Sequence, residues 1–171
     1  GVMIAGAGGT IATQAENVIK TVRPAGKIPV PGRARRADLL DAAFLGGTAA
    51  HGIELDDGYR HGSAHCGCVV IPTVLAVAYD KHASGRALIE AVVAGYETNI
   101  CLARACAPEL RQRGFHPTSA VGPFGAAMAK FYSDNLSQEV QKGHRAKFEA
   151  GGFNTRAPVG YSASTKTACT D

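Results

Sequence analysis

Asp38-Leu-Leu-Asp-Ala-Ala-Phe-Leu-Gly-Gly-Thr-Ala-Ala-His51 has the clearest structural pattern in the chain, because its apolar residues recur at helical spacing. We expect a buried helix here. Gly46 and Gly47 would each cost this helix about 1 kcal/mol relative to alanine, so we also expect another backbone to pass close to them. The positions expected on the buried face are Leu39, Leu40, Ala43, Phe44, Gly47 and Ala50.

Helical patterns continue on both sides of this run. Residues 1–9 are expected to form a loose end, and prolines and glycines predict an extended linker over residues 23–32. No alternating pattern predicts a strand, so the predicted fold class is all-α, a helical bundle. Besides 38–51, helices are expected over residues 10–22, 69–82, 86–105, 118–129 and 133–150, with a disordered tail at 162–171.

The composition agrees with packed helices and limits the possible partners. Hydrophobic residues make up 46% of the 171 residues and aromatic residues only 6%, so small side chains allow helices to approach closely. No apolar run reaches the roughly 18 residues of a membrane span. The net charge of +4 permits anionic small-molecule substrates and lacks the dense basic character that nucleic-acid binding favours.

The cysteines and the first residues indicate the compartment. Five cysteines form an odd set without disulfide-scaffold spacing, which is typical of reduced thiols in a cytoplasmic protein. The chain starts at Gly1 and carries no signal-peptide pattern, so we interpret it as a soluble segment of something longer.

A polar loop at residues 52–68 interrupts the helical pattern and is dense in ionisable groups. Neighbouring carboxylates raise the pKa of a histidine, which suits general acid/base catalysis near neutral pH. A second loop, residues 111–117, carries His116, and we expect the two loops to lie at the same end of the helical body. Ordinary solvated loop charges are the alternative interpretation. The groups in the first loop are Glu54, Asp56, Asp57, His61 and His65.

A zinc site in this loop is a competing hypothesis. His61, His65, Cys66 and Cys68 all have suitable ligand chemistry. However, structural zinc sites usually space their cysteines as C-x₂₋₄-C, and a C-x-C pair with one adjacent histidine matches poorly. The predicted site therefore contains no metal.

Several short motifs, in the same order along the chain, resemble the MmgE/PrpD family. The resemblance extends from about residue 38 to residue 129 and continues more faintly to residue 1. The motifs are Ala-Ala-His-Gly-Ile-Glu-Leu-Asp-Asp at 49–57, His-Cys-Gly at 65–67, Val-Ile-Pro at 70–72, Ala-Gly-Tyr-Glu at 94–97, Gly-Phe-His-Pro-Thr at 114–118 and Gly-x-x-Gly-Ala-Ala at 122–127.

The resemblance implies a fold and a chemistry. The family includes 2-methylcitrate dehydratase, cis-aconitate decarboxylase and iminodisuccinate epimerase, which act on a carbon α to a carboxylate without a metal or an iron–sulfur cluster. Full-length members pack a helical domain against a smaller α+β lid, usually in a homodimer. We therefore expect a small di- or tricarboxylate substrate, no cofactor and a homodimer. The lid and the family's active-site lysines are missing from this chain, so we expect an incomplete enzyme.

The resemblance also implies which residues are catalytic. His65 matches the histidine of the family's His-Pro-Gly, with Cys66 in place of the proline, and His116 matches that of His-Pro-Thr. One of them would remove the proton α to a carboxylate and the other would return it. Asp57 matches the last acid of the acidic motif, and Glu54 stands where an aspartate is usual. These two carboxylates would orient and tune the histidines.

Substrate binding is implied for four further positions. Arg60, His61 and Thr118 are the side chains expected to hold the substrate. Gly58 stands where many family members have threonine, so a hydroxyl that could bind the substrate is missing. That departure leaves the identity of the carboxylic acid open.

Residues 131–161 are similar to a different family, the serine recombinases, at the helix that leaves their catalytic domain and at the Arg-Ala-Pro-x-Gly-Tyr turn. The predicted domains are therefore 1–130, 131–161 and the tail. This segment supports an alternative function, a non-catalytic helical interaction module with a DNA- or partner-contacting arm. Its acidic and basic residues nearly balance, however, so strong nucleic-acid binding is not expected.

Overall fold

The computed structural model describes residues 1–149, and gives only the backbone for residues 136–141, 143–144 and 148. By its internal contacts the chain divides into two compact units, Gly1–Ser137 and Gln138–Asp171. The polar loops and the residues that contact them lie in the first unit. The predicted tail at 162–171 and the turn at 156–161 lie outside the described residues.

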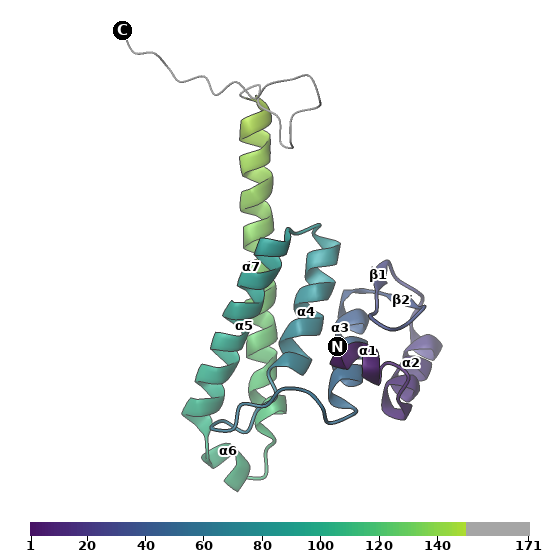
Figure 1. The fold of residues 1–171 in the computed structure, drawn as a ribbon, viewed down its shortest axis with the longest axis vertical. Coiled ribbons are helices and arrows are strands. Elements are labelled where there is room, and N and C mark those ends of the chain that lie inside the picture. The colour runs from purple at the N-terminus through teal and green to yellow at the C-terminus, as the bar shows by residue number, and fades with distance from the viewer. Residues whose placement is uncertain (150–171) are drawn as a thin grey trace. The chain divides into compact units, whose positions relative to one another are not determined.

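The described residues are helical apart from loops and one small hairpin, which confirms the all-α prediction (Figure 1). The hairpin pairs Ile28 with Ala37 in antiparallel register. No helix among the described residues is long and apolar enough to cross a membrane. The elements are α1 (Val2–Gly6), α2 (Thr10–Val22), β1 (Ile28–Pro29), β2 (Arg36–Ala37), α3 (Leu39–His51), α4 (Gly67–Asp80), α5 (Gly85–Cys106), α6 (Glu109–Gln112) and α7 (Pro117–Glu149).

Three local expectations were wrong. Residues 2–6 form the short helix α1 instead of a loose end, and strand β1 forms within the extended linker although no strand was expected. Helix α7 runs without a break where two helices were expected. Ser133, expected as a possible N-cap, is instead fully buried within α7, and Asp134 pairs with Lys130 one turn earlier. An i,i+4 ion pair stabilises a helix that continues through it.

Helix α3 packs through its small residues. Leu40 and Phe44 are 70% and 57% exposed, so their predicted place in the core is wrong. The expected close approach at the two glycines is present: a Cβ on Gly46 would lie 2.8 Å from the Cβ of Pro72 in α4. Because α4 comes this near, the buried side of α3 is made of Asp41, Ala42, Leu45, Gly46, Ala49 and Ala50.

Helices α4, α5 and the first part of α7 share a second core. Val70 and Val74 of α4 pack with Ala91 of α5 and Ala129 of α7, all fully buried. Gly95 lets α5 and α7 approach closely, since a Cβ there would lie 2.8 Å from that of Ala129. This packing fixes the N-terminal ends of α4 and α7, which border the two polar loops.

Candidate active site

The loop between α3 and α4 is tied to two helix starts. Asp57 Oδ1 accepts a hydrogen bond from the backbone N–H of Gly67 at 2.9 Å, at the first residue of α4. The unpaired N–H groups and the positive dipole of a helix N-terminus favour a carboxylate there. The backbone N–H of His65 donates to Thr118 Oγ1 at 2.8 Å, in the first turn of α7. The loop is therefore anchored to α4 through Asp57 and to α7 through the backbone of His65.

Three histidines from three different segments meet beside this loop. His51 ends α3, His65 precedes α4, and His116 precedes α7. The ring centroids of His51 and His65 are 4.9 Å apart, and His116 lies 6.4 Å from each of them. The rings of His65 and His116 are stacked, with an interplanar angle of 22°. The two loops thus lie at the same end of the helical body, as expected from the sequence.

One buried carboxylate lies among these rings. The side chain of Asp56 is 3% exposed, and its Oδ2 accepts a hydrogen bond from Nδ1 of His51 at 2.9 Å. The same oxygen lies 3.5 Å from Nδ1 of His65. A carboxylate that binds an imidazole nitrogen fixes the tautomer and the orientation of the ring.

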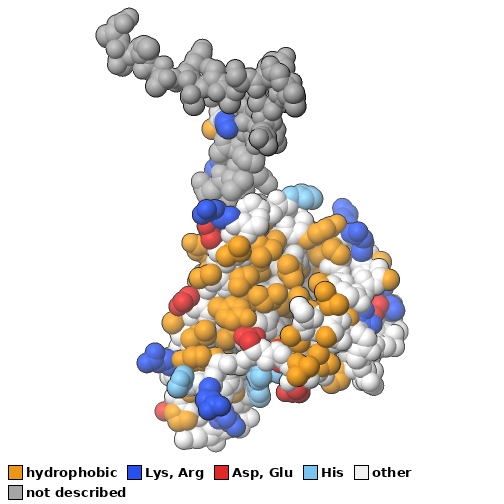
Figure 2. Space-filling view, viewed as in Figure 1, with side chains coloured by type: hydrophobic (Ala, Val, Ile, Leu, Met, Phe, Trp, Pro, Cys, Tyr) orange, Lys and Arg blue, Asp and Glu red, His pale blue; other side chains and the backbone are white. Residues whose placement is uncertain are grey.

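A cavity of about 570 Å³ opens beside the two stacked histidines. His65 and His116 line it together with two arginines, Arg60 and Arg111. Arg111 also donates to Ser63 Oγ at 3.2 Å, which holds its guanidinium against the loop. Figure 2 shows histidine and Lys/Arg side chains gathered at the end of the first unit that carries α6. This arrangement suits an anionic ligand.

Four of the predicted residues line the cavity: Gly58, Arg60, His65 and His116. A Cβ added to Gly58 would meet His65 Cε1 at 3.8 Å, an ordinary van der Waals distance. Thr118 is 7% exposed and lies below the loop, where its hydroxyl holds the backbone of His65.

The remaining predicted residues lie elsewhere on the loop. Glu54 is exposed, has a positive φ of 54°, and lies outside the lining of the cavity. His61 is also exposed and contacts the ring of Tyr59 edge-on, with 5.8 Å between centroids. Asp57 lines a second, smaller cavity of about 220 Å³, together with Asp56 and Tyr96.

The sequence interpretation did not single out His51 and Asp56 as site residues. His51 entered only as a letter of a family motif, and Asp56 only as one of three loop acids. The available signal was the position of His51 at the end of its helix. The chain turns directly after this helix, at residues 52–54, and the turn brings the carboxylate of Asp56 back to His51.

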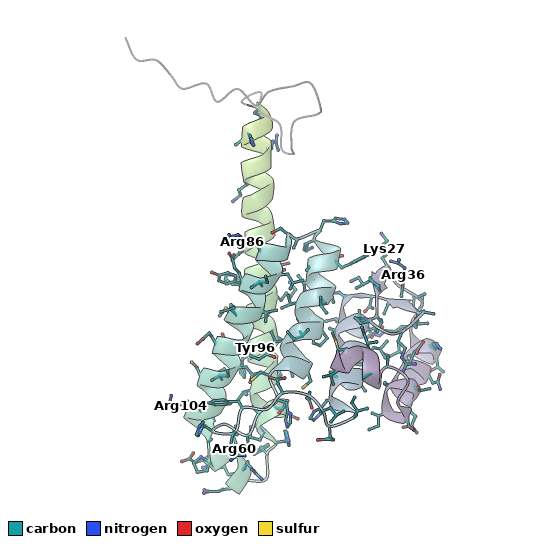
Figure 3. The ribbon with its side chains drawn as sticks, viewed as in Figure 1. Lys27, Arg36, Arg60, Arg86, Tyr96 and Arg104 are labelled. Carbon is teal, nitrogen blue, oxygen red and sulfur yellow. The ribbon has the colours of Figure 1, made fainter. Side chains whose placement is uncertain are left out.

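Three groups near Asp56 and Asp57 hold their protons more tightly than usual. Burial, followed by the charge of Asp57, raises the pKa of the Cys66 thiol to about 11. Burial, followed by the charges of Asp56 and Asp57, raises the pKa of Cys68 to about 12. Burial and Asp57 also raise the pKa of Tyr96, which lies between α5 and α4 (Figure 3). These thiols and this phenol are neutral at physiological pH.

The group of residues that could hold a metal differs from the set considered in the sequence. Among the described residues, the His/Cys/Asp/Glu group with suitable proximity is His51, Asp56 and His65, whose ligand atoms all lie within 4.8 Å of one another. The two cysteines do not belong to it.

Comparisons with known proteins agree with the sequence resemblance. The model of the MmgE/PrpD N-terminal domain matches residues 1–139, which extends past the boundary predicted at residue 130. A curated relative, the cis-aconitate decarboxylase-like protein oryM of Aspergillus oryzae, is 31% identical over 124 residues. That alignment covers 68% of this chain and 26% of the relative, so the chain spans about a quarter of the relative's length.

Proposed function

The chain belongs to the MmgE/PrpD family, as its N-terminal domain, and from this premise we propose that it forms part of the active site of a lyase or isomerase. The substrate proposed is a small di- or tricarboxylic acid, and the reaction takes place at a carbon α to one of its carboxylates. The name of the relative, a cis-aconitate decarboxylase-like protein, supports this class of substrate. The proposed reaction needs no cofactor.

One observation carries the proposal: the stacked pair His65 and His116 lines the same cavity as Arg60 and Arg111. Guanidinium groups bind carboxylates through paired, charge-assisted hydrogen bonds. A carboxylate held there presents its α-carbon to an imidazole, which is the usual group for proton transfer near neutral pH. Two imidazoles allow one to remove the proton while the other returns it.

The anchoring contacts support separate roles for the remaining residues. Asp57 holds the start of α4 through Gly67 N, and Thr118 holds the backbone of His65. We propose both as positioning residues. The role of Glu54 in tuning the histidines, the role of His61 in binding substrate, and the homodimer all remain predictions from the resemblance.

Replacing Arg60 by glutamine is expected to weaken citrate binding about tenfold or more, because a charge-assisted hydrogen bond contributes about 1.5–3 kcal/mol. Isothermal titration calorimetry of the chain with citrate measures this. Arg104→Gln is the matched control, because it removes the same charge as Arg60→Gln. Arg104 is exposed on α5 and lies outside the cavity lining (Figure 3). Equal weakening by both variants would show that net charge, and not this cavity, determines binding.

Replacing Gly58 by threonine is expected to be tolerated and to tighten carboxylate binding by a fewfold. The added Cβ meets only the edge of the His65 ring at van der Waals distance, and its hydroxyl supplies a donor at the cavity wall. The same calorimetric titration measures the change, with Gly58→Val as the control that lacks the hydroxyl. If threonine and valine behave alike, the hydroxyl does not contact the ligand.

A further inference from the structure

We propose that His51, Asp56 and His65 form a binding site for a divalent transition-metal ion of the Zn²⁺ and Co²⁺ type, and that the bound ion inhibits proton transfer by His65. The binding stands on the geometry of the three side chains alone. The inhibition rests on the proposed function.

The distances between ligand atoms fit a small cation. Tetrahedral Zn²⁺ with bonds of about 2.0–2.1 Å to nitrogen and oxygen places its ligand atoms about 3.3 Å apart. Asp56 Oδ2 lies 2.9 Å from His51 Nδ1 and 3.5 Å from His65 Nδ1, one on each side of that value. All three ligand atoms lie within 4.8 Å of one another. An ion can therefore enter if these distances change by about 1.5 Å or less.

Two buried polar atoms of the cluster make no hydrogen bond. Asp56 Oδ1 and His65 Nδ1 are both buried without a hydrogen bond, and the side chain of Asp56 is 3% exposed. A buried acceptor without a partner costs free energy, and more so when it is charged. A cation between these groups would satisfy the nitrogen of His65 and neutralise the carboxylate. The oxygen that faces the position of the ion is Oδ2, which lies within 3.5 Å of both Nδ1 atoms.

The donor set selects the type of ion. Two imidazoles and one carboxylate suit zinc, cobalt, nickel and copper, whereas magnesium and calcium prefer oxygen ligands. Three protein ligands leave a fourth tetrahedral position for water or for a carboxylate, as in zinc sites that are not purely structural. On binding, the ion replaces the proton that His51 shares with Asp56.

The effect on proton transfer follows from the nitrogen used. A metal bound at Nδ1 of His65 leaves the proton of the ring on Nε2. The ring can then donate a hydrogen bond but cannot accept a proton, so it no longer acts as a base. His116 lies outside the ligand group, so the ion does not occupy its ring nitrogens.

The experiment uses the chain dialysed against a chelator and then titrated with ZnCl₂ by calorimetry and with CoCl₂ by visible absorption. We expect one ion per chain and the intense visible bands of four-coordinate cobalt, without the near-ultraviolet band of a cobalt–thiolate bond. Asp56→Asn and His51→Ala should each weaken zinc binding more than about 100-fold, since even outer groups change metal affinity by 10–100-fold. His61→Ala, a histidine of the same loop outside the cluster, should bind zinc like the parent chain.

Several outcomes would overturn the site. These are no zinc binding, binding that is unchanged in both Asp56→Asn and His51→Ala, or a cobalt–thiolate band. His51 has a side chain that is 36% exposed, so His51→Ala tests the site even if the buried Asp56→Asn fails to fold. Circular dichroism of the metal-free variants verifies folding. Zinc that binds as expected but leaves α-proton exchange unchanged refutes the inhibition alone, whereas exchange that is absent even without metal counts against the proposed function and not against the site.

Discussion

Replacing His116 by alanine is expected to slow exchange of the substrate's α-proton by about 10²–10⁴-fold, the usual contribution of a positioned acid or base. His116 is exposed at the cavity wall, and its ring stacks on that of His65. Its loss leaves no cavity in the core, so the free energy of unfolding should change by no more than about 1 kcal/mol. Nuclear magnetic resonance in deuterated water measures the exchange for citrate-like acids, and thermal denaturation measures the stability.

His65→Ala should produce a loss of similar size. Its backbone N–H still donates to Thr118 Oγ1, so the loop keeps its anchor at α7. His82→Asn is the control, because His82 is an exposed histidine outside the cavity and asparagine tolerates its positive φ of 52°. If either His65→Ala or His116→Ala unfolds the chain, or if exchange survives in both, the catalytic assignment is wrong.

The helices could be predicted because their apolar spacing is local information. The buried face of α3 could not, because the pattern gives equal weight to large and small apolar residues. Leu40 and Phe44 raise the hydrophobicity of one side, yet the glycines and alanines allow α4 to come close on the other. The side of α3 that carries small residues is buried because it packs closely against α4. The sequence of α3 alone does not contain this information, since it depends on the partner helix.

The residues of the candidate site could be predicted where they lie directly next to a helix end. His65 and His116 each precede a helix that was expected from the sequence, and both line one cavity. The central role of Asp56 was not predictable, because three acids share one loop and only its folded path decides which is buried. Asp56 is 3% exposed in its side chain, whereas Glu54 faces solvent. Residue type alone cannot distinguish them.

Replacing Gly67 by alanine is expected to destabilise the chain by about 2–5 kcal/mol and to lower its Tm by roughly 5–15 °C at this chain length. A Cβ at Gly67 would overlap Asp57 Oδ1 and would lie 2.7 Å from the hydroxyl oxygen of Tyr96. The carboxylate of Asp57 must then leave the N–H that it caps. The variant thus loses a charge-assisted hydrogen bond at the start of α4 and gains an overpacked contact with α5.

Gly58→Ala is the matched control for this prediction, because it makes the same glycine-to-alanine change in the loop that precedes α4. Its Cβ would meet only the ring of His65, at 3.8 Å. Without a clash, glycine to alanine stabilises a chain by about 0.4–1 kcal/mol through the unfolded state, so Gly58→Ala should keep or slightly raise the Tm. Thermal denaturation of the two variants side by side measures the difference. Equal Tm values would mean that Asp57 can move at little cost, and the hydrogen bond from His65 to Thr118 of α7 would then be the contact that anchors the loop.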